Sequence, residues 1–177
     1  SEQRMTTVLL QALAENRAPV LETTARERIQ LQAEWQDISA RLAKLAAERA
    51  RRDAERHTVQ AMTAKLEATL PIARQREADF TRLAEQGFMS SHAGQDRARE
   101  RIELERDLAT QRARGAEAQA ALHEADQARA AYRAETQRAL SERQAQSRLK
   151  REQLTQERHK TEQRRRLTQM TAPVAGT

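Results

Sequence analysis

A short interruption near the midpoint of the 177-residue chain constrains the fold more than any other feature of the sequence. The segment 86–91 reads Gln-Gly-Phe-Met-Ser-Ser, and the stretches on either side of it are long, charged and nearly free of Gly and Pro. Gly and Pro are the residues that most readily end a helix. Two helical arms of similar length, joined at this point, predict one long antiparallel helical hairpin whose exposed tip is the interruption.

The composition also favours long helices over a layered globular domain. Charged residues make up 33% of the chain and aromatic residues 2%, and Ala, Arg, Gln, Glu and Leu dominate. This composition is typical of coiled coils, so we expect an all-α fold that buries a narrow seam. No apolar run approaches the ~20 residues of a transmembrane span.

Residues that break helices, chiefly Pro and Gly, divide the chain into five predicted parts. We expect a short N-terminal helix over residues 1–18, an ascending arm over 19–86 with kinks near Pro19 and Pro71, a tip over 87–91, and a descending arm over 92–168. Residues 169–177 are small, apolar and turn-rich, which predicts the first strand of a truncated further domain.

Apolar residues in each arm recur in alternating steps of three and four, the spacing of a coiled-coil seam. In the first arm the predicted seam is Trp35, Ile38, Leu42 and Leu45, followed by Val59, Met62, Leu66 and Thr69. In the returning arm it is Leu104, Leu108, Gln111, Gly115, Ala118, Leu122, Ala125, Arg129, Tyr132, Thr136 and Ala139. Each arm is therefore the natural partner of the other.

Catalytic and cofactor chemistry has little support in the sequence. The chain has no Cys, which excludes disulfides and thiolate metal sites, and its four His lie far apart. No Gly-rich loop follows a strand, so we expect no enzyme activity, cofactor or metal. The formal charge of +6 permits acidic partners, but Arg and Glu are interleaved over most of the chain, so we expect no nucleic-acid binding.

The tip carries the candidate functional residues. Phe80, Leu83, Phe88 and Met89 cluster where helical hairpins usually place polar residues. Two compatible interpretations follow: these side chains pack together to close the turn, or they form an apolar anchor that docks another helical protein.

Two segments resemble a known family. Ala172-Pro173-Val174-Ala175-Gly176-Thr177 is similar to the strand that opens the second half of a lipoyl domain, and residues 79–93 are similar to a hairpin tip, both as found in the HlyD-type periplasmic adaptor (membrane fusion) proteins. These adaptors serve bacterial type I secretion and tripartite efflux, and the resemblance is to those of RTX toxin exporters in particular.

The resemblance implies a fold and a set of partners. The hairpin would be inserted between two lipoyl half-motifs in the periplasm, with the whole protein anchored in the inner membrane. A ring of adaptors, six in number, would bridge an inner-membrane ABC transporter to a TolC-like outer-membrane channel, which the tip would contact.

The resemblance also implies which tip residues bind the channel. The family motif is Arg, then Leu four residues on, then Ser or Thr seven further. Leu83 and Ser90 match it, whereas Asp79 stands where Arg is expected, with Arg82 nearby. The candidate partner-binding residues are Asp79, Phe80, Arg82, Leu83, Gly87, Phe88, Met89 and Ser90.

An alternative of a different class is a coiled-coil scaffold, or a basic helical module that binds anionic membrane surfaces. It would use the one basic concentration in the chain, between Arg148 and Arg166. The strand-like ending at residues 172–177 favours the adaptor.

Overall fold

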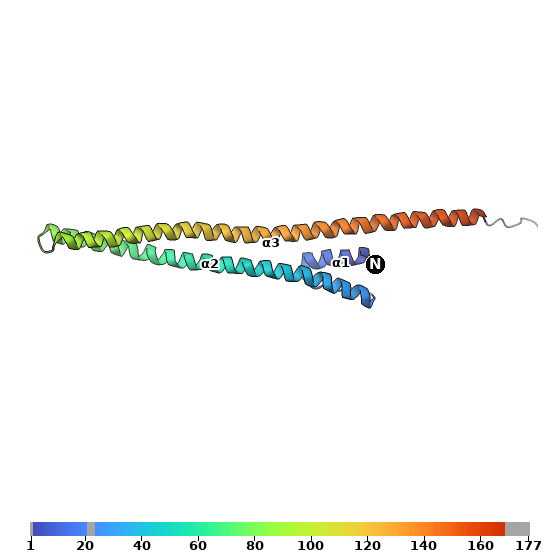
Figure 1. Cartoon of the computed structure of the whole chain (residues 1–177), viewed down its shortest axis with the longest axis horizontal. Helices are drawn as coiled ribbons and strands as arrows, with labels where there is room; N and C mark the ends of the chain where they lie inside the picture. The colour runs from blue at the N-terminus through green and yellow to red at the C-terminus, as the bar shows by residue number, and fades with distance from the viewer. Residues whose placement is uncertain (1, 21–23, 169–177) are drawn as a thin grey trace, which may run out of the picture. The chain divides into compact units, whose positions relative to one another are not determined.

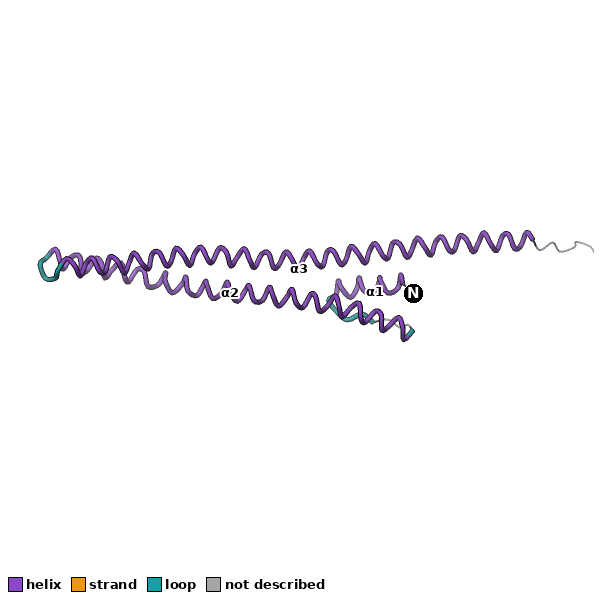
Figure 2. Tube along the Cα trace, in the orientation of Figure 1, coloured by secondary structure: helices purple, strands orange, loops and turns teal. Residues whose placement is uncertain are grey.

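The computed structural model describes residues 2–20 and 24–168, and this part of the chain is helical apart from short connections. It contains α1 (Glu2–Glu15), α2 (Ala25–Glu85) and α3 (Ser91–Thr168), with no strand among the described residues (Figures 1 and 2). The all-α expectation is met over this range. The predicted strand at 169–177 lies outside the described residues.

The chain forms two compact units, and α2 and α3 each run through both of them. The first unit comprises residues up to Arg41 together with those from Ala131 onward, and the second comprises Leu42–Ala130.

In the first unit, α1 packs against α2 and α3. The buried side chains of α1 are Met5, Thr6, Leu9, Ala12 and Leu13, and they meet a core to which α2 adds Leu31 and α3 adds Leu140. This 3–4 spacing places one apolar face of α1 inward.

Polar contacts fasten α1 at both of its ends. Arg143 of α3 pairs with Glu2 of α1 at 3.1 Å and with Glu34 of α2 at 3.0 Å, so one guanidinium joins three helices. At the other end, Arg133 Nη2 donates to the carbonyl oxygens of Leu13 (2.7 Å) and Ala14 (3.1 Å). These are carbonyls of the last turn of α1, which have no partner within the helix.

The connection from α1 to α2 shows why α2 begins at Ala25, six residues after Pro19. Asn16 adopts a positive φ of 53°, and the Arg17 N–H donates to the Ala12 carbonyl at 3.1 Å, which ends α1. Thr24 then caps α2, because its Oγ1 accepts from the Glu27 N–H at 3.4 Å. Pro19 therefore lies between two helices.

Pro71 lies inside α2, which is helical without a break from Ala25 to Glu85. Pro lacks the N–H that would bond the preceding turn, and kinks are common at such positions. The kink predicted at Pro71 is not shown by the structure, and it stays a prediction.

In the second unit, α2 and α3 run antiparallel and are joined by the turn at residues 86–90 (Figure 1). Leu70 and Ala73 of α2 and Leu108 and Leu122 of α3 are buried between them. On α3 the predicted seam from Leu104 to Ala125 is confirmed, because each of its positions is buried or half-buried.

On α2 the predicted seam is wrong at Met62, and its other positions are half-buried: Trp35, Ile38, Leu42, Leu45, Val59, Leu66 and Thr69. Met62 is 50% exposed, whereas Thr63 is half-buried. The seam follows Val59, Thr63, Leu66, Leu70, Ala73, Glu77, Phe80 and Ala84 in alternating steps of four and three. At Arg129 and Ala139 of α3, which the sequence placed in the seam, the side chains are exposed.

Candidate functional site

The tip of the hairpin is closed by a complete helix-ending motif. Gly87 has a φ of +79°, a left-handed conformation that favours Gly. The Phe88 N–H donates to the Leu83 carbonyl at 2.9 Å, and the Gly87 N–H donates to the Ala84 carbonyl at 3.0 Å. This pair of bonds is the Schellman arrangement, so the backbone of the turn is fixed by hydrogen bonds.

The helix α3 begins directly after the turn. The Ala93 N–H donates to the Ser90 carbonyl at 3.2 Å, and α3 begins at Ser91. Ser90 therefore directly precedes α3, and its carbonyl accepts a hydrogen bond from the first turn of that helix. Only residues 86–90 separate the two helices, so the side chains of the turn are presented at the end of the hairpin.

The apolar side chains at the tip divide into two groups. Phe80 is half-buried, and the Arg97 guanidinium lies over its ring at 5.0 Å from the centroid. Phe88, in contrast, is 77% exposed, while Leu83 and Met89 are 38% and 39% exposed. Packing within the turn therefore accounts for Phe80 and leaves the other three side chains facing water.

Asp79 and Arg82, the polar members of the predicted site, contact each other. Arg82 Nη2 donates to Asp79 Oδ1 at 3.2 Å, and Gln75 Nε2 donates to the same oxygen at 3.1 Å. The Asp79 carboxylate is thus held by residues of its own helix. The Arg82 side chain remains 63% exposed, so a cation stands one turn from the position where the family motif has Arg.

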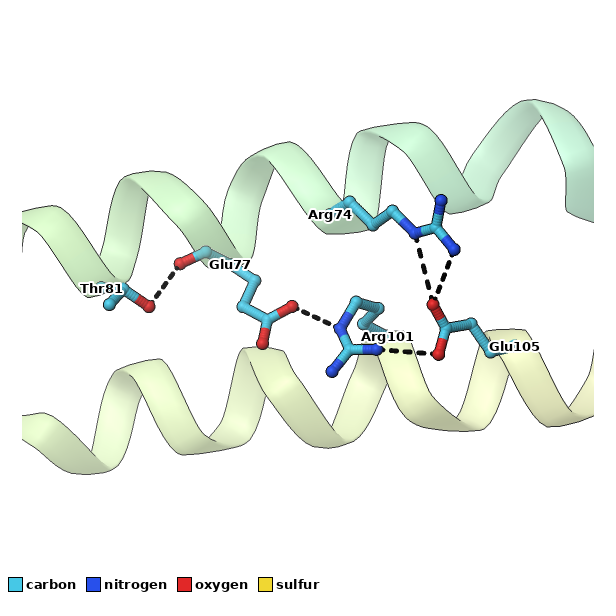
Figure 3. A network of polar contacts seen from close by, with 5 residues as sticks. All are labelled: Arg74, Glu77, Thr81, Arg101 and Glu105. Atoms are coloured by element: carbon cyan, nitrogen blue, oxygen red, sulfur yellow. Dashed lines mark hydrogen bonds and ion pairs between the residues drawn. The ribbon is translucent and has the colours of Figure 1, made fainter.

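A network of ion pairs joins the two arms close to the tip (Figure 3). Arg101 of α3 donates to Glu77 of α2 and, at 2.7 Å, to Glu105 of its own helix. Arg74 of α2 donates to Glu105 at 2.8 Å. Hydrogen bonds from Arg74 and Arg101 lower the pKa of Glu105, and the bonds to Glu77 and Glu105 raise the pKa of Arg101.

This network was not identified from the sequence. Interleaved Arg and Glu on each arm indicate solvated faces with pairs along one helix, but pairs between arms depend on how the two helices align. Two further inter-arm pairs, Arg112–Glu67 and Arg49–Asp126, each at 2.8 Å, extend the same arrangement along the second unit.

Small residues leave a shallow open groove beside the tip. It is lined by Glu77, Thr81, Ala84, Glu85, Ser91, Gly94, Gln95 and Ala98. A methyl group on Gly94 would lie 3.9 Å from Thr81 Oγ1, so the helices approach closely here. The groove contains no concentration of titratable groups that would support catalysis.

No group of three or more His, Cys, Asp or Glu side chains that could hold a metal ion occurs within residues 2–20 and 24–168. Over the same ranges, no helix combines the length and apolar character needed to cross a bilayer.

Comparison with known proteins identifies the family. The model of the CyaD alpha-helical hairpin domain matches residues 2–168, which include all three helices and the tip. No curated protein matches the chain.

Proposed function

The chain belongs to the CyaD alpha-helical hairpin domain family, and we propose that it is the hairpin of a periplasmic adaptor for type I protein (toxin) secretion. The family is defined by a helical hairpin and is not an enzyme family. In the proposed role the tip docks onto a TolC-like outer-membrane channel, and the whole adaptor links that channel to an inner-membrane ABC transporter.

The observation that carries this proposal is the exposed apolar surface at the tip. Leu83, Phe88 and Met89 present apolar atoms to water on a turn whose backbone is held by hydrogen bonds. A rigid turn loses little conformational entropy when it binds, and a large aromatic side chain such as Phe88 can fill a pocket on a partner. Arg82 and Ser90 supply the polar rim of such a contact.

The inter-arm ion pairs support the same role. The ion pairs among Arg74, Glu77, Arg101 and Glu105 hold α2 and α3 together about three turns from the end of α2. Exposed ion pairs are individually weak, but several that share partners restrict how far the two helices can separate.

For the assembly we propose a ring of six hairpins, in the periplasm, with the full adaptor anchored in the inner membrane. Charged side chains on the outer faces of the arms would then form lateral contacts. The charged residues of the inter-arm pairs already have partners within one hairpin. The lateral contacts must therefore use other charged residues, such as Glu103 and Arg106, which are exposed.

Secretion assays with tip variants test the docking. Leu83→Asp and Ser90→Arg in the full-length adaptor should abolish export of the substrate into the medium, while the circular dichroism and thermal unfolding of the hairpin stay nearly unchanged. Leu83→Asp places an unpaired charge in the apolar part of the proposed contact, which is unfavourable. Ser90→Arg places a long charged side chain at its rim, where it would obstruct the partner.

Ile29→Asp is the matched control, because Ile29 is 69% exposed and lies on α2 in the first unit. It should secrete normally. Normal export by both tip variants, with the adaptor present at wild-type levels, would contradict the proposed docking.

A further inference from the structure

The seam of α3 continues beyond the residues that pack against α1 and α2. Leu140 is buried, Gln144 donates to Thr7 of α1 at 2.7 Å, and Ser147 is half-buried. From Arg148 to Thr168, every residue of α3 is exposed. Most helical stability in proteins comes from tertiary packing, so this exposed stretch of α3 is open to a further packing partner.

The next positions of the seam form a regular pattern. Continuing in steps of four and three from Ser147 gives Arg151, Leu154, Arg158, Thr161 and Arg165, which we term the basic stripe. Residues seven apart lie on nearly the same face of a helix, so the three arginines point in one direction. Leu154, which is 52% exposed, lies between the first two.

The arginines of the basic stripe have no partner among the described residues. The carboxylates of this segment, Glu152, Glu157 and Glu162, occupy none of the stripe positions, and Glu152 pairs with Arg148 at 3.1 Å. Residues 148–168 contain eight Lys or Arg and three Glu, a net charge of +5 out of the +6 of the whole chain. The positive charge of the protein is therefore concentrated on this open stretch.

Elsewhere in the chain, three arginines of α3 that face α2 pair with a carboxylate of that helix. Arg112 pairs with Glu67 of α2 at 2.8 Å, and Arg143 pairs with Glu34 of α2 at 3.0 Å. Arg101 pairs with Glu77 in the same way. Helix packing in this protein thus combines small or apolar seam residues with Arg–carboxylate pairs between helices.

We propose that the basic stripe docks a second helix that carries carboxylates at seven-residue intervals, with apolar residues between them. Its carboxylates pair with Arg151, Arg158 and Arg165, and its apolar residues cover Leu154. An anionic bilayer fits less well, because a helix that lies on a membrane needs a broad apolar face, and only one large apolar residue lies in the stripe. The surface is separate from the tip, so the proposal does not depend on docking to a channel.

Binding of a designed peptide to the full 177-residue chain tests the proposal. The probe is a fluorescent synthetic helix of about three heptads, with Glu at every a position and Leu at every d position. Fluorescence anisotropy should show saturable binding that weakens as the salt concentration rises. The triple variant R151E/R158E/R165E should bind at least about tenfold more weakly, since three exposed ion pairs are lost.

A second triple variant, K160E/R164E/R166E, is the matched control. It changes the net charge of the same segment by the same amount but alters no stripe position. This variant should retain most of the affinity, and a peptide with Lys in place of Glu should bind R151E/R158E/R165E instead. Circular dichroism of both variants verifies that α3 stays helical.

Three results would overturn the proposal. One is an absence of saturable binding to the Glu peptide, and another is an equal loss of affinity in the two triple variants, which would indicate attraction by net charge alone. The third is tight co-sedimentation with vesicles of phosphatidylserine and phosphatidylcholine that is reduced equally by both triple variants, together with no peptide binding. That result would assign the segment to the membrane.

Discussion

Replacing Gly115 by Ala and replacing Gly87 by Ala should change the stability of the hairpin in opposite directions. Gly115 lies within α3, and a Cβ at this position would lie 3.8 Å from Val59 Cγ1, an ordinary van der Waals distance. At Gly87 a Cβ would meet nothing within 4 Å, but the φ of +79° is unfavourable for any residue with a Cβ. Packing therefore permits both substitutions, and the backbone conformation distinguishes them.

The magnitudes follow from helix propensity and backbone strain. Ala is favoured over Gly inside a helix by about 1 kcal/mol, so Gly115→Ala should stabilise the protein by about that amount. A left-handed conformation costs an L-residue about 1–2 kcal/mol, and the smaller entropy of the unfolded chain offsets part of it. Gly87→Ala should therefore destabilise the protein by about 1 kcal/mol.

Thermal unfolding followed by circular dichroism measures both effects. For a chain of this size, 1 kcal/mol corresponds to a shift in Tm of about 2–4 °C, upward for Gly115→Ala and downward for Gly87→Ala. Hydrogen exchange should also show faster exchange of the Gly87 and Phe88 amides in Gly87→Ala, because these N–H groups close the turn.

Gly94→Ala provides a reference, since its Cβ would lie 3.9 Å from Thr81 Oγ1 in an ordinary helical position. It should raise the Tm by less than Gly115→Ala does, because Gly94 lies at the start of α3 and not in the helix interior. A lower Tm for Gly115→Ala would show that the arms are packed too closely at Val59 for a methyl group. An unchanged Tm and unchanged exchange for Gly87→Ala would refute the argument from backbone strain.

Two further perturbations test the packing of α1 and the ion pairs near the tip. Leu9→Ala removes a fully buried side chain and should lower the free energy of unfolding by about 2–5 kcal/mol. Hydrogen exchange should then show loss of protection in α1. Leu10→Ala, at a half-buried position, should lower the free energy of unfolding by less. Glu105 has a lowered pKa because Arg74 and Arg101 donate to it, so its contribution to stability is present above the unfolded-state pKa and is lost as the pH falls through the folded-state value. Glu105→Gln should therefore reduce the acid-induced loss of stability in a pH series of urea unfolding curves, and identical pH profiles for the variant and the wild type would contradict this assignment.

The main features of the fold could be predicted because they depend on local sequence. Long runs of Ala, Arg, Glu, Gln and Leu predict helix wherever they stand, and Gly87 followed by Ser90 and Ser91 marks an end and a beginning. The structure places the turn at these residues. The start of α2 also had a local signal, because Thr24 and Glu27 are spaced as in a capping box. The prediction instead began the ascending arm at Pro19, six residues before Ala25.

The phase of the seam could not be read from one arm alone. Met62 and Thr63 both lie three or four residues from apolar neighbours, so the pattern permits either at the interface. The alignment of the two helices determines which of the two residues is buried. Gly115 of α3 lies opposite Val59 of α2, and in this alignment Leu70 is buried and Met62 is exposed. The inter-arm ion pairs have the same dependence, because a carboxylate and a guanidinium on different arms meet only in one alignment.

The contact of Arg133 with the carboxyl end of α1 matches the electrical polarity of that helix. The carbonyl end of a helix carries a partial negative charge, and a guanidinium that donates to the Leu13 and Ala14 oxygens complements it. If α1 lay against α3 in the reverse direction, its amide end would face the same cation and would be repelled. Arg133 at the carboxyl end and the Arg143–Glu2 pair at the amino end therefore both favour the observed direction of α1.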